Sequence, residues 1–235
     1  MPETVSVTTP DGPMDLYDAA PSQSARAAVV VIQEAFGVNH HIEDVTRRFA
    51  AEGYRAVAPH LFHRSGDPKL GYDDIGQVMP HMGALSAQAI YDDLDATFAY
   101  LEGAGFAPAR TGIVGFCMGG TVTFYAALRY PLGAAVTFYG GGVAQGRFGF
   151  EAQTELGADL RTPWLGLYGD QDKGIPVDEV ELLRTATAAA PVPTEIVRYP
   201  DADHGFHCDA RDSYHASSAE DAWRRTLDWF AHHID

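Results

Sequence analysis

Short apolar runs alternate with amphipathic segments along most of the chain. An uninterrupted apolar run is typical of a strand that is buried on both faces of a sheet, and a 3.6-residue period is typical of a helix with one apolar face. In the segment 86–101, for example, the apolar residues recur at helical spacing. The predicted strands are 27–32, 54–58, 111–114, 134–139, 164–168 and 195–199. The predicted helices are 42–51, 86–101, 121–128, 177–190 and 217–233.

Strands that alternate with helices predict an α/β fold, with a mainly parallel sheet covered by helices on both faces. The 235 residues contain no internal repeat or linker, so we expect one domain over 1–235. The turn signal Pro10-Asp11-Gly12 predicts an N-terminal hairpin within 1–20. The stretch 59–85 lacks clear periodicity and is expected to be an irregular excursion near the functional site.

Charge and composition exclude several classes of partner. The formal net charge is −16 and the basic residues are scattered, which argues against nucleic acid. No apolar run approaches the roughly 20 residues that a membrane span requires. The first residues carry neither a basic nor an apolar signal region, so a cytoplasmic protein is expected, as a monomer or homodimer.

The segment Gly115-Phe116-Cys117-Met118-Gly119-Gly120 lies between a predicted strand and a predicted helix. It matches the Gly-x-nucleophile-x-Gly pattern of a nucleophile elbow, with a cysteine in the position of the nucleophile. The turn strains the backbone of the nucleophile and needs small neighbours, which the glycines provide. Cys117 is therefore the candidate nucleophile.

Polar residues at the ends of other predicted strands supply the partners that such a thiol needs. Glu34 follows the strand 27–32, Asp170 and Asp172 follow 164–168, and His204 follows 195–199. The chain order of nucleophile, acid and histidine is that of an α/β-hydrolase triad. Either aspartate fits the position of the acid.

These residue types predict nucleophilic catalysis by a thiolate. A free thiol has a pKa of about 8.5, and a histidine within hydrogen-bonding reach can take its proton. The helix that begins after Cys117 also favours a negative charge at its N-terminus. The backbone N–H of Met118, with that of Ala35, is expected to form the oxyanion hole.

Other histidines and the second cysteine have competing interpretations. His207 and His215 also follow the last strand, but His204 lies on the strand-end loop itself. The pairs His40-His41 and His232-His233 lack a set of carboxylate partners, so no metal and no cofactor is predicted. Cys117 and Cys208 have no Cys-x-x-Cys spacing, and a structural disulfide between them is not expected.

With these motifs, the sequence resembles the dienelactone hydrolase (carboxymethylenebutenolidase) family of α/β-hydrolases from about 29 to 230. The matching motifs are 33–39, 115–120, 169–172 with 175–176, and 203–206. The resemblance implies Cys117 as the nucleophile, His204 as the base and Asp172, rather than Asp170, as the acid. It also implies that Glu34 contacts the thiol in the resting enzyme.

The resemblance further implies a substrate pocket. Tyr139 matches a family tyrosine near the pocket, and Phe36 and Phe206 lie within matched motifs, so these three are expected to contact the substrate. Family members that hydrolyse dienelactone hold its carboxylate with arginines. Here Cys208 occupies one of those positions, and neither Arg64 nor Arg211 lies where the motif requires an arginine.

The expected activity is hydrolysis of a lactone or carboxylic ester through a covalent acyl-enzyme. A small-molecule ester or lactone is the expected partner, and a neutral or larger substrate is as consistent with the residues as dienelactone. Two alternatives remain open at this point. One is a thioesterase of the same fold, and the other is a non-catalytic ligand-binding or thiol redox-sensing protein, in which Cys208 and Cys117 pair under oxidation.

Overall fold

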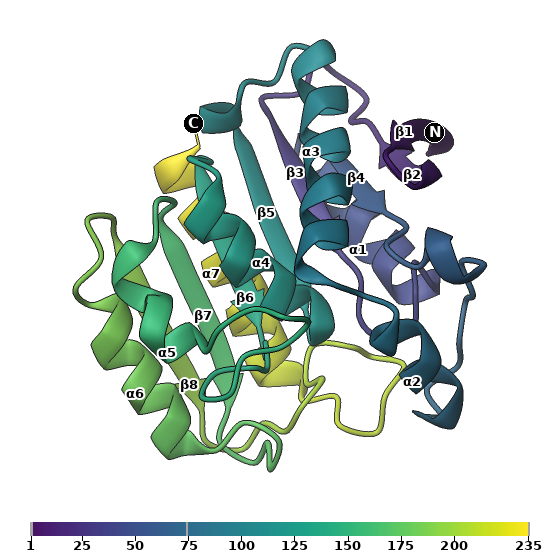
Figure 1. The fold of residues 1–235 in the computed structure, drawn as a ribbon. Helices are drawn as coiled ribbons and strands as arrows, with labels where there is room; N and C mark the ends of the chain where they lie inside the picture. The colour runs from purple at the N-terminus through teal and green to yellow at the C-terminus, as the bar shows by residue number, and fades with distance from the viewer. Residues whose placement is uncertain (1, 74, 235) are drawn as a thin grey trace.

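The predicted alternation of strands and helices is present in a computed structural model, which describes residues 2–73 and 75–234 (Figure 1). The strands are β1 (Glu3–Thr9), β2 (Gly12–Ala19), β3 (Ala27–Ile32), β4 (Tyr54–Pro59), β5 (Thr111–Phe116), β6 (Ala134–Phe138), β7 (Trp164–Gly169) and β8 (Thr194–Tyr199). The helices are α1 (His40–Ala51), α2 (Ile75–Gly83), α3 (Ala87–Gly103), α4 (Met118–Arg129), α5 (Gln153–Leu156), α6 (Val177–Thr187) and α7 (Ala216–His233). Single 3₁₀ turns are η1 (His63–Ser65), η2 (Pro108–Arg110) and η3 (Gly157–Asp159).

These strands form one eight-stranded sheet in the order β1-β2-β4-β3-β5-β6-β7-β8. β1 and β2 form an antiparallel hairpin, and β2 pairs antiparallel with β4. All other pairings are parallel. The chain thus forms a single α/β-hydrolase domain, in which the carboxyl ends of β3, β5, β7 and β8 lie at one edge of the sheet.

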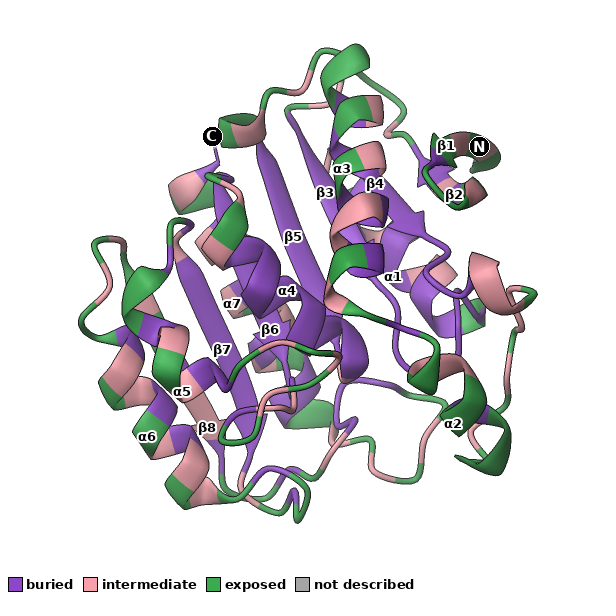
Figure 2. Cartoon of the chain, in the orientation of Figure 1, coloured by how far each residue is buried: buried purple, intermediate pink, exposed green. Residues whose placement is uncertain are grey.

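Helices cover both faces of this sheet. In Figure 1, α3 and α4 lie in front of the strands, whereas α1 and α7 lie behind them. The two rear helices are joined by aromatic contacts of Phe49 with Trp223 and Phe230. All six residues of β3 and all six of β5 are buried, as their uninterrupted apolar sequences predict (Figure 2).

The helix boundaries follow from local capping. Asn39 caps α1, because its side chain accepts a hydrogen bond from the Ile42 N–H at 3.3 Å. Ser86 caps α3 in the same way through the Ala89 N–H. Gly53, with a φ of +92°, then reverses the chain from α1 into β4, because a residue with a Cβ rarely adopts that conformation.

The stretch after β4 is more ordered than the sequence analysis predicted. It contains η1 and the helix α2, which the sequence does not reveal because it includes Pro80 and two glycines, residues with low helix propensity. Within α2, Ile75 and Met79 are 66% and 61% exposed. Tertiary contacts, rather than intrinsic propensity, therefore hold α2 against the domain: Val78 is buried, Met82 packs against the core, and His81 is hydrogen-bonded to Ser65 over 2.8 Å.

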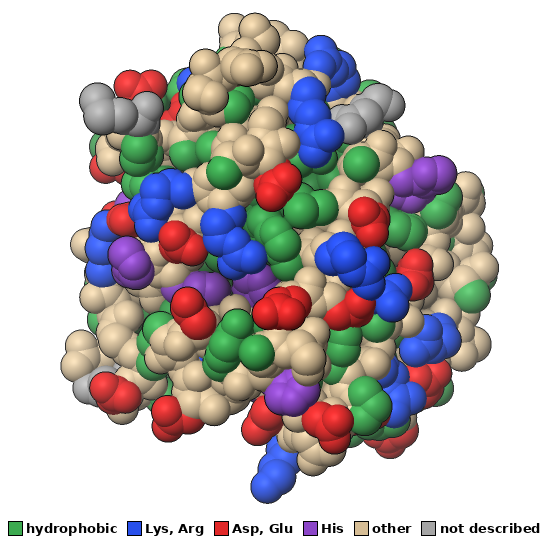
Figure 3. All heavy atoms as spheres, turned by 180° about the vertical axis from the view of Figure 1, so that it is seen from behind, with side chains coloured by type: hydrophobic (Ala, Val, Ile, Leu, Met, Phe, Trp, Pro, Cys, Tyr) green, Lys and Arg blue, Asp and Glu red, His purple; other side chains and the backbone are tan. Residues whose placement is uncertain are grey.

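The surface carries both signs of charge. On the rear face, Lys and Arg side chains are interspersed with Asp and Glu (Figure 3). Among the described residues, no helix is long and apolar enough to cross a bilayer.

Candidate active site

Cys117 lies on the turn between β5 and α4, at the carboxyl end of a central strand. Its φ and ψ of +55° and −113° are strained for a residue with a side chain. A Cβ at Gly115 would collide with the Gly119 backbone, and a Cβ at Gly119 would collide with backbone oxygens of Ile32 and Gln33. The two glycines therefore permit the close approach of strands and helix that the elbow requires.

His204 and Asp172 lie beside this elbow on two separate loops. The Nδ1 of His204 donates a hydrogen bond to Oδ2 of Asp172 over 2.6 Å. The other oxygen of Asp172 accepts the Gly174 N–H at 2.8 Å, which fixes the orientation of the carboxylate. The His204 side chain is 29% exposed, whereas that of Asp172 is only 4% exposed. This geometry leaves Nε2 of His204 as the ring nitrogen available to the thiol.

The surroundings of His204 favour its protonated form. Burial lowers the pKa of His204, but the negative charge of Cys117, with hydrogen bonds to Asp172 and Cys117, raises it to about 10. An imidazolium beside a thiolate is the ion pair expected of an activated cysteine nucleophile.

Replacement of Cys117 by alanine is expected to lower the pKa of His204 from about 10 towards the ordinary value of 6.5. Cys117 makes the largest contribution that raises this pKa. Without it, burial lowers the pKa of His204 and only Asp172 raises it. The titration is measured from the ring-proton NMR signals of His204 in the wild type and the variant. An unchanged titration midpoint would contradict the ion pair.

Asp170, the other candidate acid, is held elsewhere. Both of its carboxylate oxygens accept hydrogen bonds from the Arg198 guanidinium, at 2.8 and 2.7 Å. The geometry thus supports the choice of Asp172, which the resemblance implied and which the residue pattern alone left open.

A cavity of about 320 Å³ opens over Cys117 and its neighbours His204 and Asp172. Its wall contains Ala35 and Phe36 from the loop after β3, and apolar side chains of α2, including Ile75 and Met79. Cys117, Asp172 and His204 also line it. The excursion 59–85 therefore contributes a wall of the site through α2.

Two arginines line the cavity, and the sequence analysis did not identify either of them as a site residue. Arg211 lies in a turn in which its backbone N–H donates to the Cys208 carbonyl. Its guanidinium can lie against Gly205, because glycine has no Cβ to collide with it. Arg147 reaches the cavity from the long loop after β6. Arg64 is remote from them, since it forms ion pairs with Asp11 and Asp93.

Glu34 is completely buried and binds Arg211 rather than the thiol. The Nη1 of Arg211 lies 3.3 Å from Oε1 of Glu34. Among the described residues, Oε2 of Glu34 has no hydrogen-bond partner. The predicted contact of Glu34 with Cys117 is thus replaced by an ion pair with Arg211, while Cys117 interacts with His204.

The predicted substrate-contacting residues divide into two groups. Phe36 lines the cavity, and its contact with the substrate stays a prediction. Tyr139 and Phe206 are completely buried and do not line it, because they pack against each other behind His204. Tyr139 therefore contacts His204 and Phe206 contacts Tyr139, whereas the sequence predicted that both would contact the substrate.

The two predicted oxyanion donors come from different segments, the start of α4 and the loop after β3. Met118 is the first residue of α4, where a backbone N–H has no carbonyl partner within the helix. Ala35 lies in the cavity wall.

Both cysteines are free thiols, and Cys208 is completely buried.

Comparison with known proteins identifies the family of this chain. The sequence pattern of the dienelactone hydrolase family matches residues 14–234. The "Putative carboxymethylenebutenolidase" of Escherichia coli K12 is 43% identical over 225 residues, which cover 92% of this chain and 82% of that protein. A protein of the same name from Methylorubrum extorquens is 40% identical over 96% of this chain and 79% of its own length.

A solved structure is also similar. The crystal structure named "Putative Dienelactone Hydrolase" from Klebsiella pneumoniae superposes with a TM-score of 0.89 at 40% identity, and the match covers 98% of both chains. The elbow, the strand-end histidine and the extent of these matches lead to the same conclusion. The chain belongs to the dienelactone hydrolase family and is a hydrolase of the lactone and ester class.

Proposed function

We propose that this hydrolase opens lactones or cleaves carboxylic esters through an acyl-enzyme on Cys117. The observation that carries the proposal is the thiol on a strained elbow, next to a histidine that is held by Asp172 over 2.6 Å. This set supplies a nucleophile, a base and an orienting carboxylate at the floor of one cavity.

The reaction proceeds in two displacements. The Cys117 thiolate attacks the carbonyl carbon, and the tetrahedral intermediate collapses when the carbon–oxygen bond breaks. Nε2 of His204 gives its proton to the leaving oxygen, which in a lactone remains attached to the acyl chain. His204 then takes a proton from water, the hydroxide attacks the thioester, and the thiolate leaves with the product acid.

Backbone donors stabilise the negative charge that forms on the carbonyl oxygen. The Met118 N–H has no acceptor within its helix because of its position at the start of α4, and Ala35 lines the same cavity, so its N–H is the proposed second donor. Two such donors are typical of an oxyanion hole in this fold.

The substrate is proposed to carry a carboxylate near the reacting carbonyl. Arg147 is an exposed residue that lines the cavity wall. Arg211 binds Glu34 through Nη1, and the other N–H donors of its guanidinium can bind a ligand. Phe36 and the apolar residues of α2 would contact the carbon skeleton. An unsaturated lactone acid has both features, and the name carboxymethylenebutenolidase of the relatives describes such a compound.

The test compares an unsaturated lactone that carries a carboxylate with its neutral methyl ester, together with simple aryl esters. We expect ring opening of both lactones, and a higher kcat/KM for the acid. Arg147→Gln should reduce this preference about fivefold, because an exposed charge pair contributes up to about 1 kcal/mol. Arg161→Gln is the matched control, since Arg161 is exposed and precedes β7, at the opposite edge of the sheet.

Two failures of this experiment have different meanings. Absence of turnover of every lactone and ester would overturn the proposed function. Turnover with no preference for the acid, or a preference that Arg147→Gln leaves intact, would overturn only the carboxylate recognition by Arg147.

A further inference from the structure

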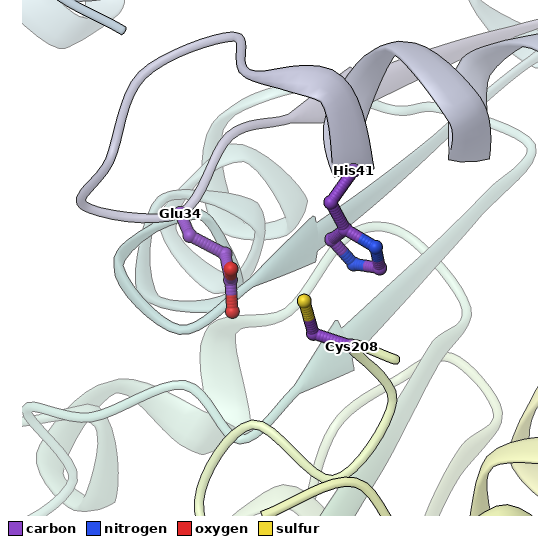
Figure 4. A group of neighbouring side chains, drawn as sticks. All are labelled: Glu34, His41 and Cys208. Atoms are coloured by element: carbon purple, nitrogen blue, oxygen red, sulfur yellow. The ribbon is translucent and has the colours of Figure 1, made fainter. Parts of the chain in front are cut away.

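We propose that Glu34, His41 and Cys208 form a binding site for a divalent transition-metal ion such as Zn²⁺. Each residue offers one ligand atom, and these three atoms all lie within 4.8 Å of one another. The side chains point towards each other from the loop after β3, from α1 and from the loop after β8 (Figure 4). None of the three belongs to the proposed triad.

Two of the candidate ligand residues have buried polar atoms with unused bonding capacity. Within the described part of the chain, neither Nε2 of His41 nor Oε2 of Glu34 has a hydrogen-bond partner. Glu34 is completely buried and His41 is 6% exposed. A buried polar atom without a partner is destabilising, and coordination to a cation would remove this cost.

The donor set selects the class of metal. A thiolate, an imidazole and a carboxylate together favour Zn²⁺ or Co²⁺, whereas Mg²⁺ and Ca²⁺ prefer oxygen ligands alone. Three protein ligands leave a tetrahedral ion one further position for water or another small ligand.

The protonation states of the ligands are compatible with this chemistry. Burial lowers the pKa of His41, which keeps its imidazole in the neutral form that binds metals. Burial and the charge of Glu34 raise the pKa of Cys208 to about 11, so the thiol must release its proton to solvent when the metal–sulfur bond forms.

Neighbouring groups are arranged to support the ligands. Arg211 binds Oε1 of Glu34, so Oε2 remains available to the metal. The Tyr72 hydroxyl lies 3.2 Å from Sγ of Cys208 and accepts a hydrogen bond from Nδ2 of Asn39 at 3.1 Å. Because Asn39 donates to the Tyr72 oxygen, the Tyr72 hydroxyl can donate its own proton to a Cys208 thiolate. Such a hydrogen bond from a residue outside the coordination sphere orients a metal ligand.

One of the three proposed ligands borders a surface hollow that is separate from the catalytic cavity. His41 lines a separate surface hollow of about 380 Å³, together with Asn39, Asp44, Tyr72 and Asp209. Its two carboxylates attract cations to the opening. No local sequence pattern indicates this cluster, because the fold joins His41 to residues 7 positions before and 167 positions after it, whereas its neighbour in sequence is His40.

Cobalt binding to the full-length Cys117→Ser protein tests the proposal, because Cys208 is then the sole cysteine. We expect one Co²⁺ per chain, with thiolate-to-cobalt charge-transfer absorption and the visible bands of a tetrahedral ion, which Zn²⁺ displaces. In this background, Cys208→Ala should abolish the charge-transfer band, and His41→Gln should weaken binding by about tenfold or more.

Matched controls separate this site from surface histidines and from misfolding. His232→Gln with His233→Gln should leave the cobalt spectrum unchanged, and circular dichroism should show that each variant is folded. His41→Asn provides a second replacement if His41→Gln does not fold. Absence of a charge-transfer band, its persistence in the Cys208→Ala variant, or unchanged affinity in the folded His41 variants would overturn the proposal. Because the readout is metal binding, it is independent of whether the protein hydrolyses any ester.

Discussion

Replacement of Cys117 by alanine is expected to reduce kcat/KM for a lactone or aryl ester by about 10⁴-fold or more, because triad members act as a unit. The variant keeps the cavity and both backbone donors, but it has no atom that can form the acyl bond. The steady-state rates of wild type and variant on the same substrate measure the loss. Mass spectrometry of the intact protein with a slowly hydrolysed ester should show one acyl group on the wild type and none on the variant.

The outcome also distinguishes covalent catalysis from other routes. A Cys117→Ala protein that retains wild-type turnover would exclude Cys117 as the nucleophile. An acyl group found on another residue of the wild type would exclude it as well. The unfolding temperature of the variant serves as the control for folding.

Asp172→Asn is expected to lower kcat by about 10⁴-fold, with a much smaller change in KM, in the way that loss of the triad carboxylate does elsewhere. The neutral amide cannot stabilise the imidazolium, and it can hold His204 in the wrong tautomer. Steady-state kinetics of the variant with the wild-type substrate measure both constants.

Asp170→Asn is the matched control, since the two aspartates are two residues apart and follow the same strand. Asp170 binds Arg198 on the partly exposed side of the loop and makes no hydrogen bond to His204 in the described structure. Its replacement should cost at most about 1 kcal/mol of stability and leave kcat within a few fold. Comparable losses in kcat for the two variants would refute the assignment of Asp172.

The sequence predicts the sheet and the position of Cys117 because both depend on local patterns. The apolar run of β5 predicts a buried strand. Gly115 and Gly119, at both sides of Cys117, indicate that strand and helix backbones approach each other closely there. The placement of His204 depends only on the rule that parallel strands carry their ligand-binding loops at one edge. These features would persist if the surrounding loops were different.

The walls of the site could not be predicted in this way. Arg211 reaches Glu34 through the path of an irregular loop, and no local pattern in the sequence encodes that path. Arg147 lies in a loop of glycines and polar residues, where periodicity carries no information. The residue four positions after His204, where the family resemblance leads one to expect an arginine, is Cys208. Arg211, from the same loop, lines the cavity instead.

The shallow packing of α2 separates the stability of the catalytic groups from that of the cavity wall. Cys117 is anchored at the end of a central strand whose residues are all buried, whereas Val78 is the sole residue of α2 that is buried. Local opening of such a weakly packed helix requires much less free energy than global unfolding. The wall can therefore fluctuate, or change by mutation, while Cys117, His204 and Asp172 keep their arrangement, so the proposed chemical step is compatible with a changed range of substrates.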